Sequence, residues 1–153
     1  MKISLARVFA VLIALAFTIP VSAETCDVNY GTFEASEDFV FKHTGTIDSF
    51  RGTLVRKTDG FTITFDVGKM AGTHMHKGKQ AACTFFRSHK IGGLAALTGI
   101  EWIPDGQRIT TTIAFDLKNG IDPANFWADF HKDSDIAEFI LIVTTYKPKD
   151  REK

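Results

Sequence analysis

Apolar and polar residues alternate strictly in FTITFDV, residues 61–67. Because successive side chains of a β-strand point to opposite faces, this pattern is typical of a strand with one buried face. The same two-residue period returns in RITTTIAFDL, residues 108–117, which follows the turn signal PDG at 104–106. These two stretches predict an antiparallel β-protein.

Five further β-rich runs lie around these two and are separated by short pieces that contain Gly, Asp, Asn or Lys. They are Asp38–His43, Thr46–Arg56, Ala82–Ser88, Leu97–Ile103 and Ile136–Tyr146. Seven or eight strands at this spacing favour an antiparallel sandwich or barrel. The last run is apolar on both faces, so we expect a central strand there.

One short helix is expected between the last two strands. It would have Asp122 as its cap and Pro123 in its first position, and would continue over Phe126–Phe130. The sequence therefore predicts an all-β fold with a single short helix.

The chain begins with features of an export signal. Residues 1–23 carry Lys2 and Arg7, then the apolar run Val8–Phe17, then Pro20 and the small-residue site VSA. The whole chain has 153 residues, no net charge and 44% hydrophobic residues, which excludes disorder, collagen and coiled coil. We expect a signal peptide at 1–23 and one β-barrel domain at 24–153, located in the periplasm or secreted.

Two cysteines are present, Cys26 and Cys83. In an oxidising compartment an even count of two predicts one disulfide. Neither cysteine lies in a paired redox spacing or in a nucleophile motif, so a catalytic thiol is not expected.

Positive charge is concentrated in one segment. Between Asp66 and Glu101 there are 34 residues without any Asp or Glu, and they include Lys69, Lys77, Lys79, Arg87, Lys90 and the histidines His74, His76 and His89. This predicts an anionic partner: a phosphate or carboxylate head group, an anionic membrane surface, or an acidic protein surface. The alternative is a solvated segment whose charges pair with the acidic excess elsewhere. Nucleic acid is not expected, because the chain has no overall basicity and no recognition motif.

The sequence HMH at 74–76 is the nearest thing to a metal motif. In an extended segment His74 and His76 would point to the same face and could chelate one ion. A third ligand would still be needed, and the surrounding lysines disfavour a bound cation, so a metal cofactor is not expected.

Enzyme signatures are missing, including the Gly-Xaa-Ser-Xaa-Gly elbow and the His-Glu-Xaa-Xaa-His metal motif, so we do not expect an enzyme. Phenylalanine is abundant, with 14 residues, and most of them occupy inward strand positions. Two interpretations remain open: an ordinary filled core, or the wall of a cavity that holds one apolar ligand.

Two short stretches, FVFKHTG at 39–45 and FRGTL at 50–54, resemble the opening of the YceI-like family of periplasmic proteins, and FDVGKM at 65–70 followed by His74-Met75 is similar to that family's next strand and histidine segment. The resemblance covers roughly the first half of the domain after the leader. It implies a lipocalin-like antiparallel barrel whose apolar interior holds an isoprenoid or other amphiphilic chain, with the head group at the barrel mouth.

We therefore expect an exported protein that binds an apolar or amphiphilic small molecule without changing it chemically. The expected ligand-binding residues are Phe41, His43, Phe61, Phe65 and Phe115 inside the barrel, with Lys77, Lys79 and Arg87 at the head group. Two alternatives remain: a periplasmic or secreted protein-binding or inhibitor module with a filled barrel, and a periplasmic copper or zinc binder.

Overall fold

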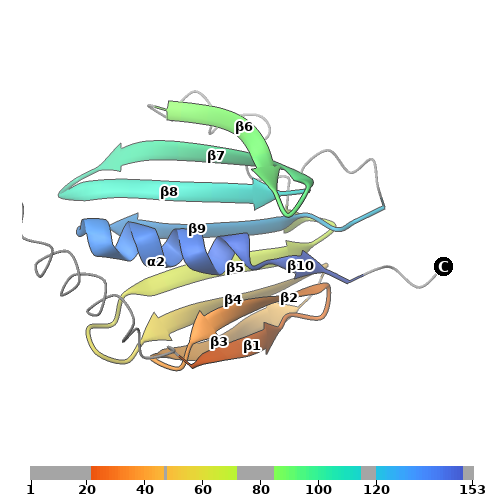
Figure 1. Cartoon of the computed structure of the whole chain (residues 1–153), viewed down its shortest axis with the longest axis horizontal. Coiled ribbons are helices and arrows are strands. Elements are labelled where there is room, and N and C mark those ends of the chain that lie inside the picture. The colour runs from red at the N-terminus through yellow and green to blue at the C-terminus, as the bar shows by residue number, and fades with distance from the viewer. Residues whose placement is uncertain (1–21, 47, 72–84, 115–119, 150–153) are drawn as a thin grey trace, which may run out of the picture.

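The computed structural model describes residues 22–46, 48–71, 85–114 and 120–149. These residues form ten strands and the helix α2 (Figure 1). The strands are β1 (Ala23–Asp27), β2 (Gly31–Ser36), β3 (Phe39–Thr46), β4 (Ser49–Arg56), β5 (Thr62–Gly68), β6 (Phe85–Ile91), β7 (Leu94–Ile103), β8 (Gly106–Ile113), β9 (Ala124–Phe130) and β10 (Lys147–Pro148), and α2 spans Asp133–Thr144.

Two antiparallel sheets make up the β-structure. The larger has seven strands in the order β3-β4-β5-β9-β8-β7-β6, and the smaller has three in the order β1-β2-β10. The predicted antiparallel β-rich fold with one helix is confirmed at this level. A closed barrel is not found among the described residues, because the larger sheet ends at β3 on one side and at β6 on the other.

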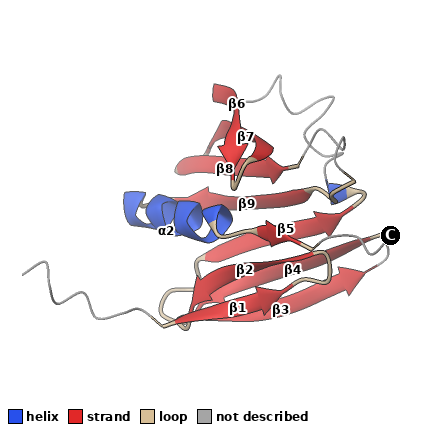
Figure 2. Ribbon diagram, turned by 45° about the vertical axis from the view of Figure 1, so that its right-hand side comes forward, coloured by secondary structure: helices blue, strands red, loops and turns tan. Residues whose placement is uncertain are grey.

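Helix α2 and the smaller sheet both lie on one face of the seven-stranded sheet, which Figures 1 and 2 show from two directions. The core is the layer between them. Phe33 of β2 packs edge-on against Phe65 of β5 and Phe126 of β9, at ring distances of 5.2 and 5.5 Å. Phe139 of α2 packs edge-on against Phe130 of β9 at 5.3 Å. The period-two pattern of 61–67 thus delivers its phenylalanines to the covered face.

The predicted strand at Ile136–Tyr146 is wrong, because this segment belongs mostly to α2. The buried residues Phe139, Ile142 and Val143 follow a spacing of three and four, whereas Ile140 and Leu141 are 52% and 67% exposed. Burial therefore follows the period of a helix. Two aspartates in the first turn, Asp133 and Asp135, complement the positive helix N-terminus.

The predicted helix over Phe126–Phe130 is also wrong. This segment belongs to β9, a central strand between β5 and β8. Ala124, Phe126, Ala128 and Phe130 are all buried, and the residues between them alternate to the other face. A central position in a sheet outweighed the cap signal of Asp122-Pro123.

Six other strands lie near their predicted positions, and β7 and β8 form the expected hairpin, with Ile103 opposite Gly106. Asp105 adopts the positive φ of 64° that the tight turn requires. Strands β1 and β2 were not predicted. No helix in the described ranges has the length and apolar character needed to span a bilayer.

Candidate functional site

A groove of about 400 Å³ runs between α2 and the β6–β8 end of the larger sheet. Most of its exposed surface is apolar, although polar and aliphatic or aromatic residues both contribute to the lining. The lining residues are Phe85, Arg87, His89, Lys90 and Ile91 of β6, Thr98 of β7, Thr111 of β8, and Phe139, Ile140, Val143 and Thr144 of α2. Its volume lies within the range of about 300 to 1,000 Å³ that is usual for small-ligand sites.

The sheet wall of the groove follows from strand register. Arg87 of β6 is opposite Thr98 of β7, which in turn is opposite Thr111 of β8. Residues paired in this way share a face, so Phe85, Arg87 and His89 all point to the side that α2 covers. Strand β6 is the edge of the sheet, and every one of its residues except Ile91 is exposed.

The charged side chains among the described lining residues of the groove are of one sign. Arg87 and Lys90 are lining residues, and no Asp or Glu is found among the described residues that line the groove. A cationic rim beside an apolar wall suits a ligand that has an anionic head and an apolar chain.

Three polar side chains form a hydrogen-bonded row across the floor of the groove. The Nε2 atom of His89 lies 2.8 Å from the Oγ1 atom of Thr98, which lies 2.9 Å from the Oγ1 atom of Thr111. Hydroxyl and imidazole groups can each donate or accept, so this row can adapt to either kind of polar ligand atom.

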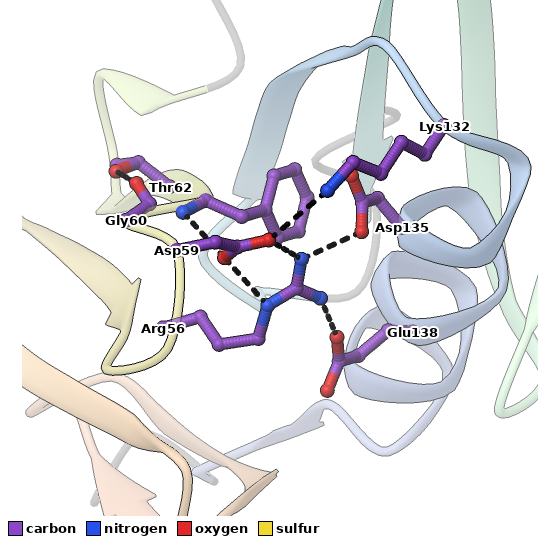
Figure 3. A network of polar contacts seen from close by, with 8 residues as sticks. Arg56, Asp59, Gly60, Thr62, Lys132, Asp135 and Glu138 are labelled. Atoms are coloured by element: carbon purple, nitrogen blue, oxygen red, sulfur yellow. Dashed lines mark hydrogen bonds and ion pairs between the residues drawn. The ribbon is translucent and has the colours of Figure 1, made fainter.

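The other side of α2 is fixed to the larger sheet by Arg56 at the end of β4 (Figure 3). Its guanidinium donates two hydrogen bonds to Asp59, at 2.9 and 2.7 Å, and one each to Asp135 and Glu138 of α2, at 2.7 and 2.5 Å. The same group lies 4.9 Å from the centre of the Phe61 ring. These contacts lower the pKa of Asp59 and raise that of Arg56. The network holds α2 in the position that forms the groove.

Of the predicted barrel-interior residues, Phe41, His43 and Phe65 lie in a stacked aromatic cluster. Phe65 is fully buried, and its ring lies 5.6 Å from that of Phe41. His43 stacks on Phe50 at 4.4 Å. Gly52 lies opposite Phe65 in the β4–β5 register, and a side-chain carbon at that glycine would overlap the Phe65 ring. The absence of a Cβ there lets the Phe65 ring lie across β4.

The other residues predicted to bind a ligand or a metal, together with Cys83 of the predicted disulfide, either line one of two cavities or lie outside the residues that the structure describes. Arg87 lines the groove, and Phe61 lines a separate polar cleft. Phe115, Lys77, Lys79, His74, His76 and Cys83 all lie outside the described residues. The head-group role of the lysines and the metal-binding role of the histidines thus stay predictions. Within the described ranges, no three potential metal-ligating side chains form a cluster.

Cys26 is a free thiol in the structure, and the predicted bridge to Cys83 remains a prediction. Burial, with a smaller contribution from Glu24, raises the pKa of the Cys26 thiol to about 11. A thiol with so high a pKa is mostly protonated at neutral pH and is a weak nucleophile.

The groove residues that α2 contributes, above all Ile140 and Val143, were not predicted from the sequence, because this segment was expected to be a strand. Thr98 and Thr111 were not predicted either, because they give no signal until strand pairing brings them together. The basic residues of β6 were found through the charge pattern.

No family model and no curated protein matches the chain.

Proposed function

We propose that the chain is an exported binding protein that holds an anionic amphiphile, with a single apolar chain in the groove between α2 and β6–β8. One observation carries the proposal: in this groove, whose surface is mostly apolar, the charged residues of the described lining are all basic. The resemblance to YceI-like proteins supports a ligand of this kind. The ligand then lies between helix and sheet instead of in the lumen of a closed barrel.

The head group has specific partners in this arrangement. Arg87 offers a guanidinium that matches a carboxylate or phosphate in geometry, and a charge-assisted pair of this type is stronger than a neutral one. The His89–Thr98–Thr111 row lies beside it and can bind a second oxygen of the head group. The apolar chain would then contact Phe139, Ile140 and Val143.

The test is a competition experiment. The protein, delipidated by denaturing purification and refolding, is titrated with a dansylated fatty acid, and palmitate and hexadecanol are then used as competitors. Palmitate should compete at least about tenfold better than hexadecanol, a difference of about 1.4 kcal/mol. Arg87→Gln should remove most of that preference. Lys69→Gln changes an exposed lysine that does not line the groove, and should leave it intact.

A substitution that fills the groove tests whether the fatty acid binds there. Thr144→Trp should block the groove from α2, whereas Ala137→Trp places the same side chain at an exposed position of the same helix, one that is not a lining residue of the groove. We expect loss of dansyl-fatty-acid binding in the first variant only. Equal binding by both variants, or no binding by the unaltered protein, would contradict the proposal.

We also propose that the exposed surface beside the groove docks on an anionic bilayer. Phe85, Ile140 and Leu141 are 48%, 52% and 67% exposed, and the cations Arg87 and Lys90 lie on the β6 side. Exposed apolar side chains beside cations are the combination that anionic lipid surfaces attract. The protein should float with phosphatidylglycerol vesicles but not with phosphatidylcholine vesicles, and Leu141→Ser should weaken flotation. Flotation that is independent of lipid charge would refute the docking.

A further inference from the structure

A second cavity, of about 580 Å³, lies where β5 and β9 separate. The ladder between these strands pairs Thr64 with Trp127 and ends there, although both strands continue beyond that pair. An unbroken antiparallel ladder would pair Ile63 with Ala128 and then Thr62 with Asp129, which is the next hydrogen-bonded pair in this register. The described strand pairs include neither, and Thr62 and Asp129 instead line the cavity from its two sides.

The main chain of both walls is directed into this cleft. The carbonyl oxygen of Phe61 accepts a hydrogen bond from β4, and hydrogen-bonded residues alternate along an antiparallel strand. Thr62 therefore turns its N–H and C=O toward β9. Just before β9, the carbonyl of Pro123 accepts a hydrogen bond from the N–H of Gly68, so Pro123 faces β5. Every second residue after it faces the same way, and Asp129 therefore turns its N–H and C=O toward β5 as well. Two donors and two acceptors face each other without the ladder bonds that would satisfy them.

The charges around the cleft are already matched. Arg108 donates two hydrogen bonds to Asp129, at 2.6 and 2.8 Å, and this pairing lowers the pKa of that aspartate. Asp59 is bound by Arg56 and lies 3.5 Å from the Nζ atom of Lys132. A charged ligand would have to compete with these ion pairs, whereas an uncharged ligand rich in donors and acceptors would not.

The cleft also offers one aromatic surface. Trp127 is half-buried and lines the cleft beside Thr62 and Thr64. The face of an indole ring carries negative charge density, which attracts the polarised C–H groups of a sugar ring. An acetamido substituent carries one N–H and one C=O, the same pair of groups that a neighbouring strand would present.

We propose that this cleft binds an uncharged saccharide bearing an acetamido group, an N-acetylhexosamine, with the sugar ring on Trp127 and the acetamido group between the main chains of Thr62 and Asp129. The site is separate from the amphiphile groove and does not depend on it.

Trp102 and Trp127 are the two tryptophans of the chain, so Trp102→Phe makes Trp127 the sole indole emitter. This variant is titrated with chitotriose and with cellotriose, which has the same linkage but a hydroxyl in place of each acetamido group. Chitotriose should give a saturable change in emission and should bind about tenfold more tightly than cellotriose. A difference of this size corresponds to the free energy of one or two hydrogen bonds. No change with chitotriose at millimolar concentration, or equal affinity for the two trisaccharides, would overturn the proposal.

Two further variants, each in the Trp102→Phe background, place the binding in the cleft. Thr62→Phe narrows it from the β5 wall and should weaken chitotriose binding by about tenfold or more. Thr58→Phe adds the same ring at an exposed turn position that does not line the cleft, and should leave binding unchanged. Equal binding by the two variants would overturn the assignment. If Thr62→Phe lacks a cooperative thermal transition, saturation-transfer NMR on the unaltered protein decides: transfer to the acetyl methyl protons supports the site, and its absence overturns it.

Discussion

The two ends of the seven-stranded sheet are built differently, although α2 and the smaller sheet lie over the same face. At the β3–β5 end, the covered face is filled with aromatic rings, and Phe65 contacts rings from β2, β3, β4 and β9. At the β6–β8 end, Thr98 and Thr111 occupy the corresponding positions and a groove of about 400 Å³ remains. One end provides packing, and the other leaves the groove in which we propose that the ligand binds.

Under the proposed function, one sheet combines stability at one end with binding at the other. Rings packed edge to face and stacked fill volume at one end and secure the fold. Small hydroxyl residues and an exposed edge strand at the other end bury little apolar surface and contribute little to stability. Substitutions at the two ends should therefore have separable effects on folding and on binding.

The largest change in folding stability is expected from Phe65→Ala. Removing a fully buried ring from the aromatic cluster should lower the free energy of unfolding by about 3 to 5 kcal/mol. Phe85→Ala, at a ring that is 48% exposed in the groove, should cost less than about 1 kcal/mol. Urea denaturation of both variants measures the contrast. Similar losses would mean that the β6 end is as firmly packed as the β5 end.

The second largest loss of folding stability is expected from Arg56→Met. This substitution would leave the carboxylate of Asp135, 7% exposed, without its cation, and should lower the free energy of unfolding by about 3 kcal/mol. The matched control is Arg108→Met, because the Arg108–Asp129 pair is about 40% exposed and should be worth less than about 1 kcal/mol. Denaturant midpoints of both variants provide the comparison. A mild Arg56→Met variant would contradict the view that this network anchors α2.

A smaller loss of folding stability is expected at high pH. The folded Cys26 thiol keeps its proton to about pH 11, against an ordinary pKa of 9.0, because burial disfavours the thiolate. The folded state therefore binds the proton more tightly, so its stability is complete below pH 9.0 and falls between these two values, by on the order of 1 kcal/mol. Urea midpoints at pH 8 and pH 10 under reducing conditions measure the loss, which Cys26→Ala should abolish.

Burial of Tyr146 raises its pKa as well, so its contribution to stability would be lost only above the ordinary value of 10.0. Loss of stability in Cys26→Ala already at pH 9 would show that another group is responsible.

The smallest effect on folding is expected from Ile140→Ala, within about 0.5 kcal/mol, since the side chain is half exposed. Its effect on binding should be larger, because Ile140 lines the groove. Leu141→Ala is the control at a neighbouring exposed position that does not line it. Paired thermal melts and dansyl-fatty-acid titrations separate the two quantities. If both variants lose affinity equally, the apolar chain does not lie along the Ile140 side of α2.

Most of the strands could be predicted because their signal is local. The alternation in 61–67 and in 108–113 depends only on one buried face, and the β7–β8 hairpin depends only on its turn residues. The predictions of a helix over Phe126–Phe130 and of a strand over Ile136–Tyr146 were wrong for the opposite reason. A short run rich in apolar residues fits either period, and only the position in the fold, a central strand for β9 and a covering helix for α2, chooses between them.

The sequence by itself determined the antiparallel β-character of the chain, the inward phenylalanines of the strands and the basic segment that includes Arg87, because alternation and charge are properties of neighbours along the chain. Only the tertiary structure decided that the larger sheet, over the described residues, ends at β3 and at β6. It also decided that α2 faces β6 across an apolar groove, and that β5 and β9 separate beyond Thr64 and Trp127. Each of these features arises between segments distant in sequence, where packing and strand pairing outweigh local preference.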